Sequence, residues 1–187
     1  MEDARLLGQI AHPPAGAAAI DLTCGSGYAA GLLAAATGGQ VIGVDRSAGM
    51  LAEARANYPE CEFVQADILE YLRGLEDGSV DVVTCCWGLG YSRPWAVLRQ
   101  IRRVLRPGGR VGIIDNSLFS LREILACSFL AFAERPEALE NLMRFRFLTG
   151  PGQLTAYFRL LGMRPVWSDG GSRTYTVASG QAAIERL

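Results

Sequence analysis

The chain has 187 residues, of which 50% are hydrophobic and 20% charged, and this composition excludes an intrinsically disordered protein. Eighteen basic residues, all Arg, face nineteen acidic ones, and the net charge of −1 argues against a nucleic-acid binder that works through bulk charge. The absence of Lys excludes a Schiff base, and the single His excludes a histidine metal cluster, so we expect no metal site. The length suits one domain, and we treat residues 1–187 as a single domain.

The cysteines and the apolar stretches indicate the cellular compartment of the protein. Five Cys is an odd number, and none stands in a Cys-x-x-Cys pair, which does not suit a disulfide framework. The first residues carry two acids and a broken apolar run, unlike a targeting segment. The longest apolar stretch is interrupted by Arg122 and Glu123 and is too short to span a membrane. We therefore expect a cytoplasmic protein with reduced thiols and no transmembrane segment.

Regular Gly and Pro positions divide the chain into alternating strands and helices. After a short helix that ends at His12, the expected strands are 15–22, 40–45, 61–67, 80–87, 110–115, 162–167 and 173–179. The expected helices are 28–39, 46–59, 68–75, 94–105 and 153–161, with an apolar, mostly helical insert at 116–149. This alternation predicts βαβ units and a parallel sheet. The turn between the last two strands cannot hold a crossover helix, so that pair should be antiparallel.

The first chemical signal is the glycine loop TCGSG (23–27) between the first strand and its helix. Glycine lets the backbone turn tightly and lets a ligand approach the main chain at a helix N-terminus. Asp45 ends the next strand, where a carboxylate can accept hydrogen bonds from both hydroxyls of a ribose. Asp67 ends the strand after that and would lie on the same edge of the sheet, within reach of the base of a nucleoside.

Five segments then share their order and spacing with a known family: IDLTCGSG (20–27), GVDRSAGMLAEAR (43–55), FVQAD (63–67), VDVVTCCWGLGY (80–91) and IRRVLRPGGRVGIID (101–115). Together they resemble the class I S-adenosylmethionine-dependent methyltransferases, of the small-molecule, type 11-like kind. The resemblance implies an α/β, doubly wound, Rossmann-like sheet of seven strands in the order 3-2-1-4-5-7-6, with the last strand antiparallel. It also implies that S-adenosylmethionine is the cofactor and a small molecule the methyl acceptor.

The resemblance implies that the cofactor-binding residues are Asp21, Thr23, Cys24, Gly25, Gly27, Asp45, Arg46, Met50, Asp67, Ile68, Cys85 and Cys86. Asp45 would hold the ribose, Met50 would flank the adenine, and Asp67 would meet the adenine edge. The backbone carbonyls at the end of the fourth strand would face the methionine amino group. Thr23 departs from the family pattern, because the first glycine of the loop usually stands there, and its side chain narrows the site.

Two other functions fit part of the pattern. A nicotinamide-dependent oxidoreductase is possible because residues 25–30 also match G-x-G-x-x-A and Asp45 suits that fingerprint. The acid Asp21 before the loop, the second acid Asp67 and the terminal antiparallel pair favour the methyl donor. A non-catalytic nucleoside-binding module that holds a partner through the insert is the second alternative.

The acceptor side is defined by fewer signals. Methyl transfer from a sulfonium is an in-line displacement, so positioning is its main requirement. A general base is needed only if the acceptor loses a proton, and the catalytic candidates are Asp115, Tyr91 and His12. The candidate substrate residues are Trp87, Asn116, Phe129, Arg144 and Arg146. The apolar segment 118–133 predicts a lid over an apolar or aromatic acceptor, although a homodimer face or a membrane surface would suit it as well.

Overall fold

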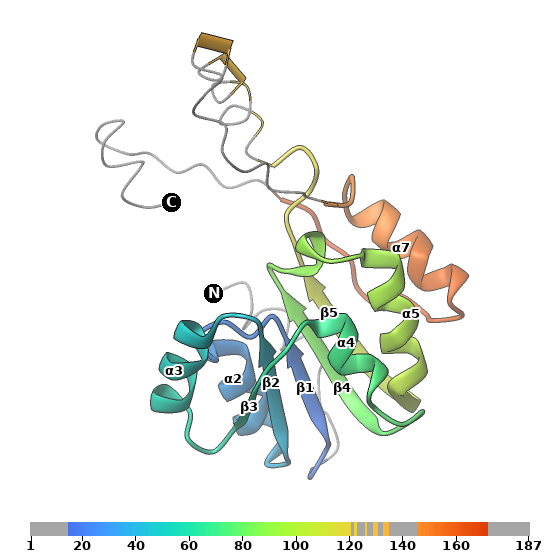
Figure 1. Ribbon diagram of the computed structural model, residues 1–187. Helices are drawn as coiled ribbons and strands as arrows, with labels where there is room; N and C mark the ends of the chain where they lie inside the picture. The colour runs from blue at the N-terminus through green and yellow to red at the C-terminus, as the bar shows by residue number, and fades with distance from the viewer. Residues whose placement is uncertain are drawn as a thin grey trace.

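The computed structural model describes residues 15–120, 122, 126, 129–130, 133–134 and 146–171. Five strands form one sheet in the order β3-β2-β1-β4-β5, and every neighbouring pair is parallel (Figure 1). The strands are β1 (Ala19–Leu22), β2 (Val41–Asp45), β3 (Glu62–Gln65), β4 (Val80–Cys86) and β5 (Leu105–Ile114). The helices are α2 (Tyr28–Thr37), α3 (Ala48–Asn57), α4 (Ile68–Arg73), the 3-10 helix η1 (Leu89–Tyr91), α5 (Pro94–Val104) and α7 (Pro151–Leu160). The protein therefore has a Rossmann-like α/β fold with a parallel sheet.

The prediction of a seven-stranded sheet is wrong for the described residues, which contain five strands. The order of these five agrees with the first five places of the predicted order. Residues 163–167, which form most of the predicted sixth strand, have no regular secondary structure. Pro165 explains this in part, because proline has no N–H for a ladder and restricts Arg164 before it. The predicted strand at 173–179 lies outside the described residues, so the antiparallel pair is not observed.

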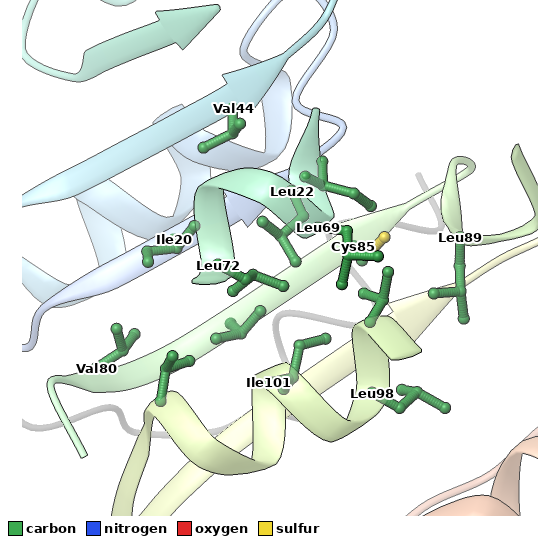
Figure 2. Packing of buried hydrophobic residues seen from close by; sticks show 14 of the residues in the cluster. Ile20, Leu22, Val44, Leu69, Leu72, Val80, Cys85, Leu89, Leu98 and Ile101 are labelled. Carbon is green, nitrogen blue, oxygen red and sulfur yellow. The ribbon is translucent and has the colours of Figure 1, made fainter. Parts of the chain in front are cut away.

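The sheet is covered on both faces because alternate residues of its central strands point in opposite directions. In β4, Val83 and Cys85 belong to the cluster that includes residues of α4 and α5 (Figure 2). Val82 and Cys86 belong to the second cluster, which includes residues of α2 and α3. Each fully buried Leu or Val side chain stabilises the folded state by about 1.5–3 kcal/mol before entropy is counted. Burial on both faces thus fixes the strands whose ends carry the predicted site.

Helix α3 begins after a polar cap, whereas α2 is flanked by glycine at both ends. The Ser47 hydroxyl accepts a hydrogen bond from the backbone N–H of Met50 and caps α3. Helix α2 starts after Gly27 and ends before Gly38, both in the left-handed conformation, with φ of 89° and 59°. Helix α2 follows β1 and α3 follows β2, so both helices begin near the strand ends that carry the predicted site.

The insert predicted at 116–149 is described only in part. The described residues 122, 126, 129–130 and 133–134 are helical and exposed. The ends of the insert meet, because the backbone N–H of Leu118 donates to the carbonyl oxygen of Leu148 at 2.7 Å. Within the ranges that the structure covers, no helix is both long and apolar enough to cross a membrane.

Candidate functional site

A cavity of about 470 Å³ lies where β1, β2, β3 and β4 end, and its size is typical of small-molecule sites. Ten of the twelve predicted cofactor-binding residues line it: Asp21, Thr23, Cys24, Gly25, Asp45, Arg46, Met50, Asp67, Ile68 and Cys86. Trp87, predicted as a substrate residue, and Tyr91, predicted as a catalytic candidate, also line it. Parallel strands bring their carboxyl ends to one edge, which is why residues far apart in the sequence meet here.

Asp45 ties the glycine loop to the start of α3. Its Oδ2 accepts a hydrogen bond from the backbone N–H of Gly25 at 3.0 Å, and its Oδ1 accepts one from Ser47 at 2.9 Å. A carboxylate offers about four acceptor positions, so each oxygen can accept one more hydrogen bond. Asp45 can therefore hold the loop and still accept from a pair of ligand hydroxyls.

Asp67 caps α4 with one oxygen of its carboxylate. Its Oδ1 accepts from the backbone N–H groups of Leu69 at 2.9 Å and Glu70 at 3.3 Å. Its Oδ2 makes no hydrogen bond with any residue that the structure describes. The Asp67 Oδ2 is therefore available to accept a hydrogen bond from an amino or hydroxyl group of a ligand.

The charge of the lining is predominantly negative. Asp21 is 1% exposed, and its Oδ1 accepts a hydrogen bond from the Thr84 hydroxyl at 2.6 Å. The lining residues include three carboxylates, from Asp21, Asp45 and Asp67, and one guanidinium, from Arg46. A cavity with this balance favours a ligand that carries positive charge.

The thiols near the cavity are not suited to nucleophilic chemistry. Burial, with a smaller effect of the Asp21 carboxylate, raises the pKa of Cys24 far above its usual range. Burial likewise raises the pKa of Cys85 to about 12. Both thiols are neutral at physiological pH, and only the thiolate is a good nucleophile or metal ligand. Within the described part of the chain, no group of three or more His, Cys, Asp or Glu could hold a metal ion.

Thr23 and Trp87 have an unusual backbone for residues that are not glycine. Their φ angles are 59° and 63°, in the left-handed region. That conformation costs about 1–3 kcal/mol for such residues and persists only where the surroundings enforce it. Both residues line the cavity, so the strain lies at the candidate site.

Two predicted cofactor-binding residues do not line the cavity. Gly27 lies at the start of α2, where an added Cβ would come within 2.9 Å of Tyr58 and 3.0 Å of Phe63. Its glycine is required by this packing as well as by its φ of 89°. Cys85 is fully buried in the core cluster that includes α4 and α5 residues. The alternation of strand side chains leaves its neighbour Cys86 in the lining instead.

Asp115 and Asn116 also lie outside the cavity lining. The Asp115 Oδ2 accepts a hydrogen bond from the backbone N–H of Gly90 at 2.6 Å, and its Oδ1 accepts one from Asn116 at 2.9 Å. Burial raises the pKa of Asp115 to about 6, although the hydrogen bonds from Gly90 and Asn116 oppose the rise. Asp115 therefore holds η1, which carries Tyr91, rather than lining the cavity itself.

The remaining substrate candidates are divided between the cavity rim and the insert. The backbone N–H of Arg146 donates to the carbonyl oxygen of Gly90 at 2.7 Å, so the chain returning from the insert lies against η1. The next residue, Phe147, packs its ring edge-on against Tyr91, with centroids 5.3 Å apart. Phe129 is 76% exposed. His12 and Arg144 lie outside the described residues.

Sequence reasoning missed several lining residues: Ser26, Tyr28, Ala29, Gly88 and Ser92. The position of Tyr28, directly after the glycine loop, was a signal that could have identified it. Gly88 had no such signal, because its role depends on a contact with Thr23, which is 65 positions earlier in the chain.

The chain matches the family model described as a methyltransferase domain over residues 20–113, which is half of its length. It is 40% identical over 110 residues to the demethylmenaquinone methyltransferase of Lactococcus lactis, covering 54% of this chain and 43% of that protein. It is also 40% identical over 111 residues to the 2-phytyl-1,4-naphtoquinone methyltransferase of Thermosynechococcus vestitus, covering 56% of this chain and 48% of that protein. The matching part thus spans less than half the length of either relative.

A solved structure with low sequence identity to this chain supports the same fold. The SAM dependent methyltransferase from Archaeoglobus fulgidus superimposes with a TM-score of 0.64 at 22% identity, covering 87% of this chain and 68% of that one. A similarity at this level of identity supports the Rossmann-like architecture alone.

Proposed function

Because the chain belongs to the methyltransferase domain family of class I, S-adenosylmethionine-dependent enzymes, we propose that it transfers a methyl group from S-adenosylmethionine to a quinone-type ring in its reduced form. The observation that carries the proposal is the cavity where four strands end, with Asp45 and Asp67 in its lining. The family itself was predicted from the order of the sequence motifs, and the family match confirms it.

The residues of the cavity fit the methyl donor. The free acceptor positions of Asp45 suit two ribose hydroxyls, and the Asp67 Oδ2 suits the amino group of an adenine. Met50 and Ile68 offer apolar surface to the base. The predominantly negative lining suits a ligand with a sulfonium and an ammonium group.

The chemistry requires positioning more than acid–base catalysis. When bound, S-adenosylmethionine would supply a methyl carbon on a positively charged sulfur for in-line attack by an electron-rich acceptor atom. The sulfur would leave as a neutral thioether, and the acceptor would lose a proton to solvent. The residues of this chain would hold the two reactants in line, and such positioning can lower the barrier by about 7–11 kcal/mol. A hydroquinone suits this reaction because its hydroxyl groups make the ring carbons electron-rich.

The rim of the cavity supports an apolar, aromatic acceptor. Four large side chains of the lining remain 41–43% exposed: Tyr28, Met50, Trp87 and Tyr91. Aromatic side chains stack favourably on an aromatic ligand. The names of the two relatives, demethylmenaquinone and 2-phytyl-1,4-naphtoquinone methyltransferase, give the acceptor class that we propose. Of the predicted general bases that the structure describes, Tyr91 lines the cavity and Asp115 does not, so we assign the acceptor contact to Tyr91.

The test is a turnover assay with a methyl-labelled donor. Purified protein is incubated without oxygen with S-adenosylmethionine carrying a labelled methyl group and with a 2-alkyl-1,4-naphthohydroquinone. We expect the label to appear on the ring carbon of the extracted naphthoquinone, as measured by mass spectrometry. The oxidised quinone serves as the matched acceptor control and should remain unmethylated.

Two outcomes would contradict the proposal in different ways. Donor uptake measured by calorimetry, with no methyl transfer to any aromatic acceptor offered, would favour the nucleoside-binding module. A melting temperature that rises with NAD(P) and not with S-adenosylhomocysteine would favour the oxidoreductase.

A further inference from the structure

The starting observation is the pair of non-glycine residues with left-handed backbone among the described residues, Thr23 and Trp87. They follow neighbouring strands: Thr23 comes directly after β1, and Trp87 directly after β4. The two strands pair in parallel with Leu22 opposite Cys85, so Thr23 leaves the sheet beside Cys86, the residue before Trp87. Strained conformations of this kind persist where neighbouring contacts enforce them, which raises the question of what holds each residue.

Thr23 makes two contacts with the chain that leaves β4. Its hydroxyl, which has a single proton to donate, lies within hydrogen-bonding distance of the carbonyl oxygen of Leu22, at 2.5 Å, and of that of Cys86, at 3.1 Å. On the other side of Trp87, a Cβ added to Gly88 would come within 2.3 Å of the Thr23 Cγ2. Gly88 has a φ of −139°, outside the left-handed region, so lack of space is the reason for glycine here.

Trp87 is therefore fixed between two residues that Thr23 contacts. From the opposite side, the backbone N–H of Trp87 donates to the carbonyl oxygen of Ile114, at the end of β5, at 2.7 Å. The side chain of Trp87 is 42% exposed and lines the cavity. The backbone of this residue is thus determined by Thr23 on one side and by β5 on the other.

We propose that Thr23 is a positioning residue that sets the orientation of Trp87 at the cavity wall, and thereby the fit of the acceptor. Thr23 reaches Cys86 through its hydroxyl, whereas its methyl group, Cβ and hydroxyl oxygen all lie 2.3–2.4 Å from the position of a Cβ added to Gly88. The link from Trp87 to the acceptor rests on the proposed function, whereas the link from Thr23 to Trp87 does not. The two parts can therefore fail separately.

The first experiment measures the environment of Trp87 directly. The chain has three Trp residues, so Trp95→Phe and Trp167→Phe leave Trp87 as the only tryptophan. In this background Thr23→Val keeps the branched shape and removes the hydroxyl, whereas Thr23→Ser keeps the hydroxyl and removes the methyl group. We expect both variants to shift the Trp87 emission to longer wavelength and to increase its quenching by acrylamide.

Thr155→Val is the matched control for these variants. Thr155 lies on α7, outside the cavity lining, with its hydroxyl 3.5 Å from that of Ser168. We expect this variant to leave Trp87 emission and quenching unchanged. Folded Thr23→Val and Thr23→Ser proteins in which Trp87 fluorescence also stays unchanged would overturn the proposal. Circular dichroism verifies folding, and if Thr23→Val does not fold, Thr23→Ser alone decides.

The second experiment tests the contact between Thr23 and Gly88. Gly88→Ala should lower the melting temperature by about 5 °C or more, because its Cβ collides with Thr23. The double variant Thr23→Gly, Gly88→Ala should recover most of that loss, because it removes the colliding side chain. The Trp87 fluorescence of this double variant should stay altered, because glycine at position 23 has no side chain to contact Cys86. If the melting temperature of the double variant fell by the sum of the two single losses, the contact between Thr23 and Gly88 would be refuted.

The third measurement separates positioning of the acceptor from binding of the donor. With the naphthohydroquinone acceptor, we expect Thr23→Val to raise the acceptor KM about tenfold, which corresponds to about 1.4 kcal/mol. The Kd for S-adenosylhomocysteine, measured by calorimetry, should rise much less. A larger effect on donor Kd than on acceptor KM would overturn the acceptor part of the proposal. If the wild-type protein methylated no acceptor, the proposed function would be refuted. The fluorescence result would then decide by itself whether Thr23 positions Trp87.

Discussion

The strands that end at the cavity and the strand at the edge of the sheet differ in how strongly their surroundings determine them. All four residues of β1 are buried, whereas only Leu105 and Gly112 are buried among the ten residues of β5. A second cavity of about 650 Å³ lies between β5, α7 and residues 162–169. The comparison teaches that burial on both faces, rather than strand propensity, specifies the part of the sheet that carries the site.

The largest difference between the two regions should appear in side-chain truncations. Leu98 is fully buried in α5, whereas Val166 is 78% exposed beside β5. We expect Leu98→Ala to lower the free energy of unfolding by about 2–5 kcal/mol. Val166→Ala should change it by less than about 0.5 kcal/mol. Urea denaturation measures both, and similar losses would contradict the difference between centre and edge.

The same comparison applies to the acidic residues. Asp45→Asn removes the charge and replaces one acceptor oxygen by an amide group that only donates. We expect the Kd for S-adenosylhomocysteine to rise about 10- to 100-fold, since hydrogen bonds to charged groups contribute about 1.5–3 kcal/mol. Asp77→Asn is the control, because Asp77 is 80% exposed and pairs with Arg103 away from the cavity. Calorimetry checks both variants. If wild type and Asp45→Asn bound S-adenosylhomocysteine with equal affinity, the assignment of Asp45 to the ribose would be refuted.

Two glycines within helices give a matched pair from the two regions. An added Cβ at Gly31, in α2, would come within 2.2 Å of the Tyr58 ring, whereas at Gly152, in α7, it would meet nothing within 4 Å. We expect Gly31→Ala to destabilise the protein by about 1–3 kcal/mol through overpacking. Gly152→Ala should stabilise it by about 0.4–1 kcal/mol, because alanine favours helix and restricts the unfolded chain. Thermal denaturation measures the two shifts, and equal signs would contradict this reading.

The smallest expected effect is the pH dependence that Asp115 contributes. Burial raises its pKa from 3.8 to about 6, so the folded protein takes up this proton at a higher pH than the unfolded chain. The free energy of unfolding should therefore fall as the pH rises from about 4 to about 6. Asp115→Asn still offers an acceptor to Gly90 and should show a smaller fall. Urea denaturation across this range, with wild type as the reference, measures the difference, and an unchanged slope would refute it.

Sequence patterns predicted most of the residues that line the cavity, because these residues stand at fixed places relative to strands. Asp45 is the last residue of β2 and Asp67 is the second residue after β3, and parallel pairing brings such strand ends together. The same reasoning did not reveal that the Cys85 side chain packs in the core while Cys86 lines the cavity, because an apolar strand buried on both faces gives no sign of which residue leaves the core. It offered Asp115 as a catalytic candidate and gave no sign of the hydrogen bond that its carboxylate accepts from the backbone N–H of Gly90.

The order of short motifs by itself determined the family, the parallel sheet and the line of acids at its edge, because each of these depends on local spacing and burial. Only the tertiary structure decided that Thr23 fills the space beside Gly88 and that Asp115 holds η1. It also decided that residues 163–167 do not extend the sheet. These features depend on atoms that are distant in the chain and close in space, and no local pattern encodes such distances.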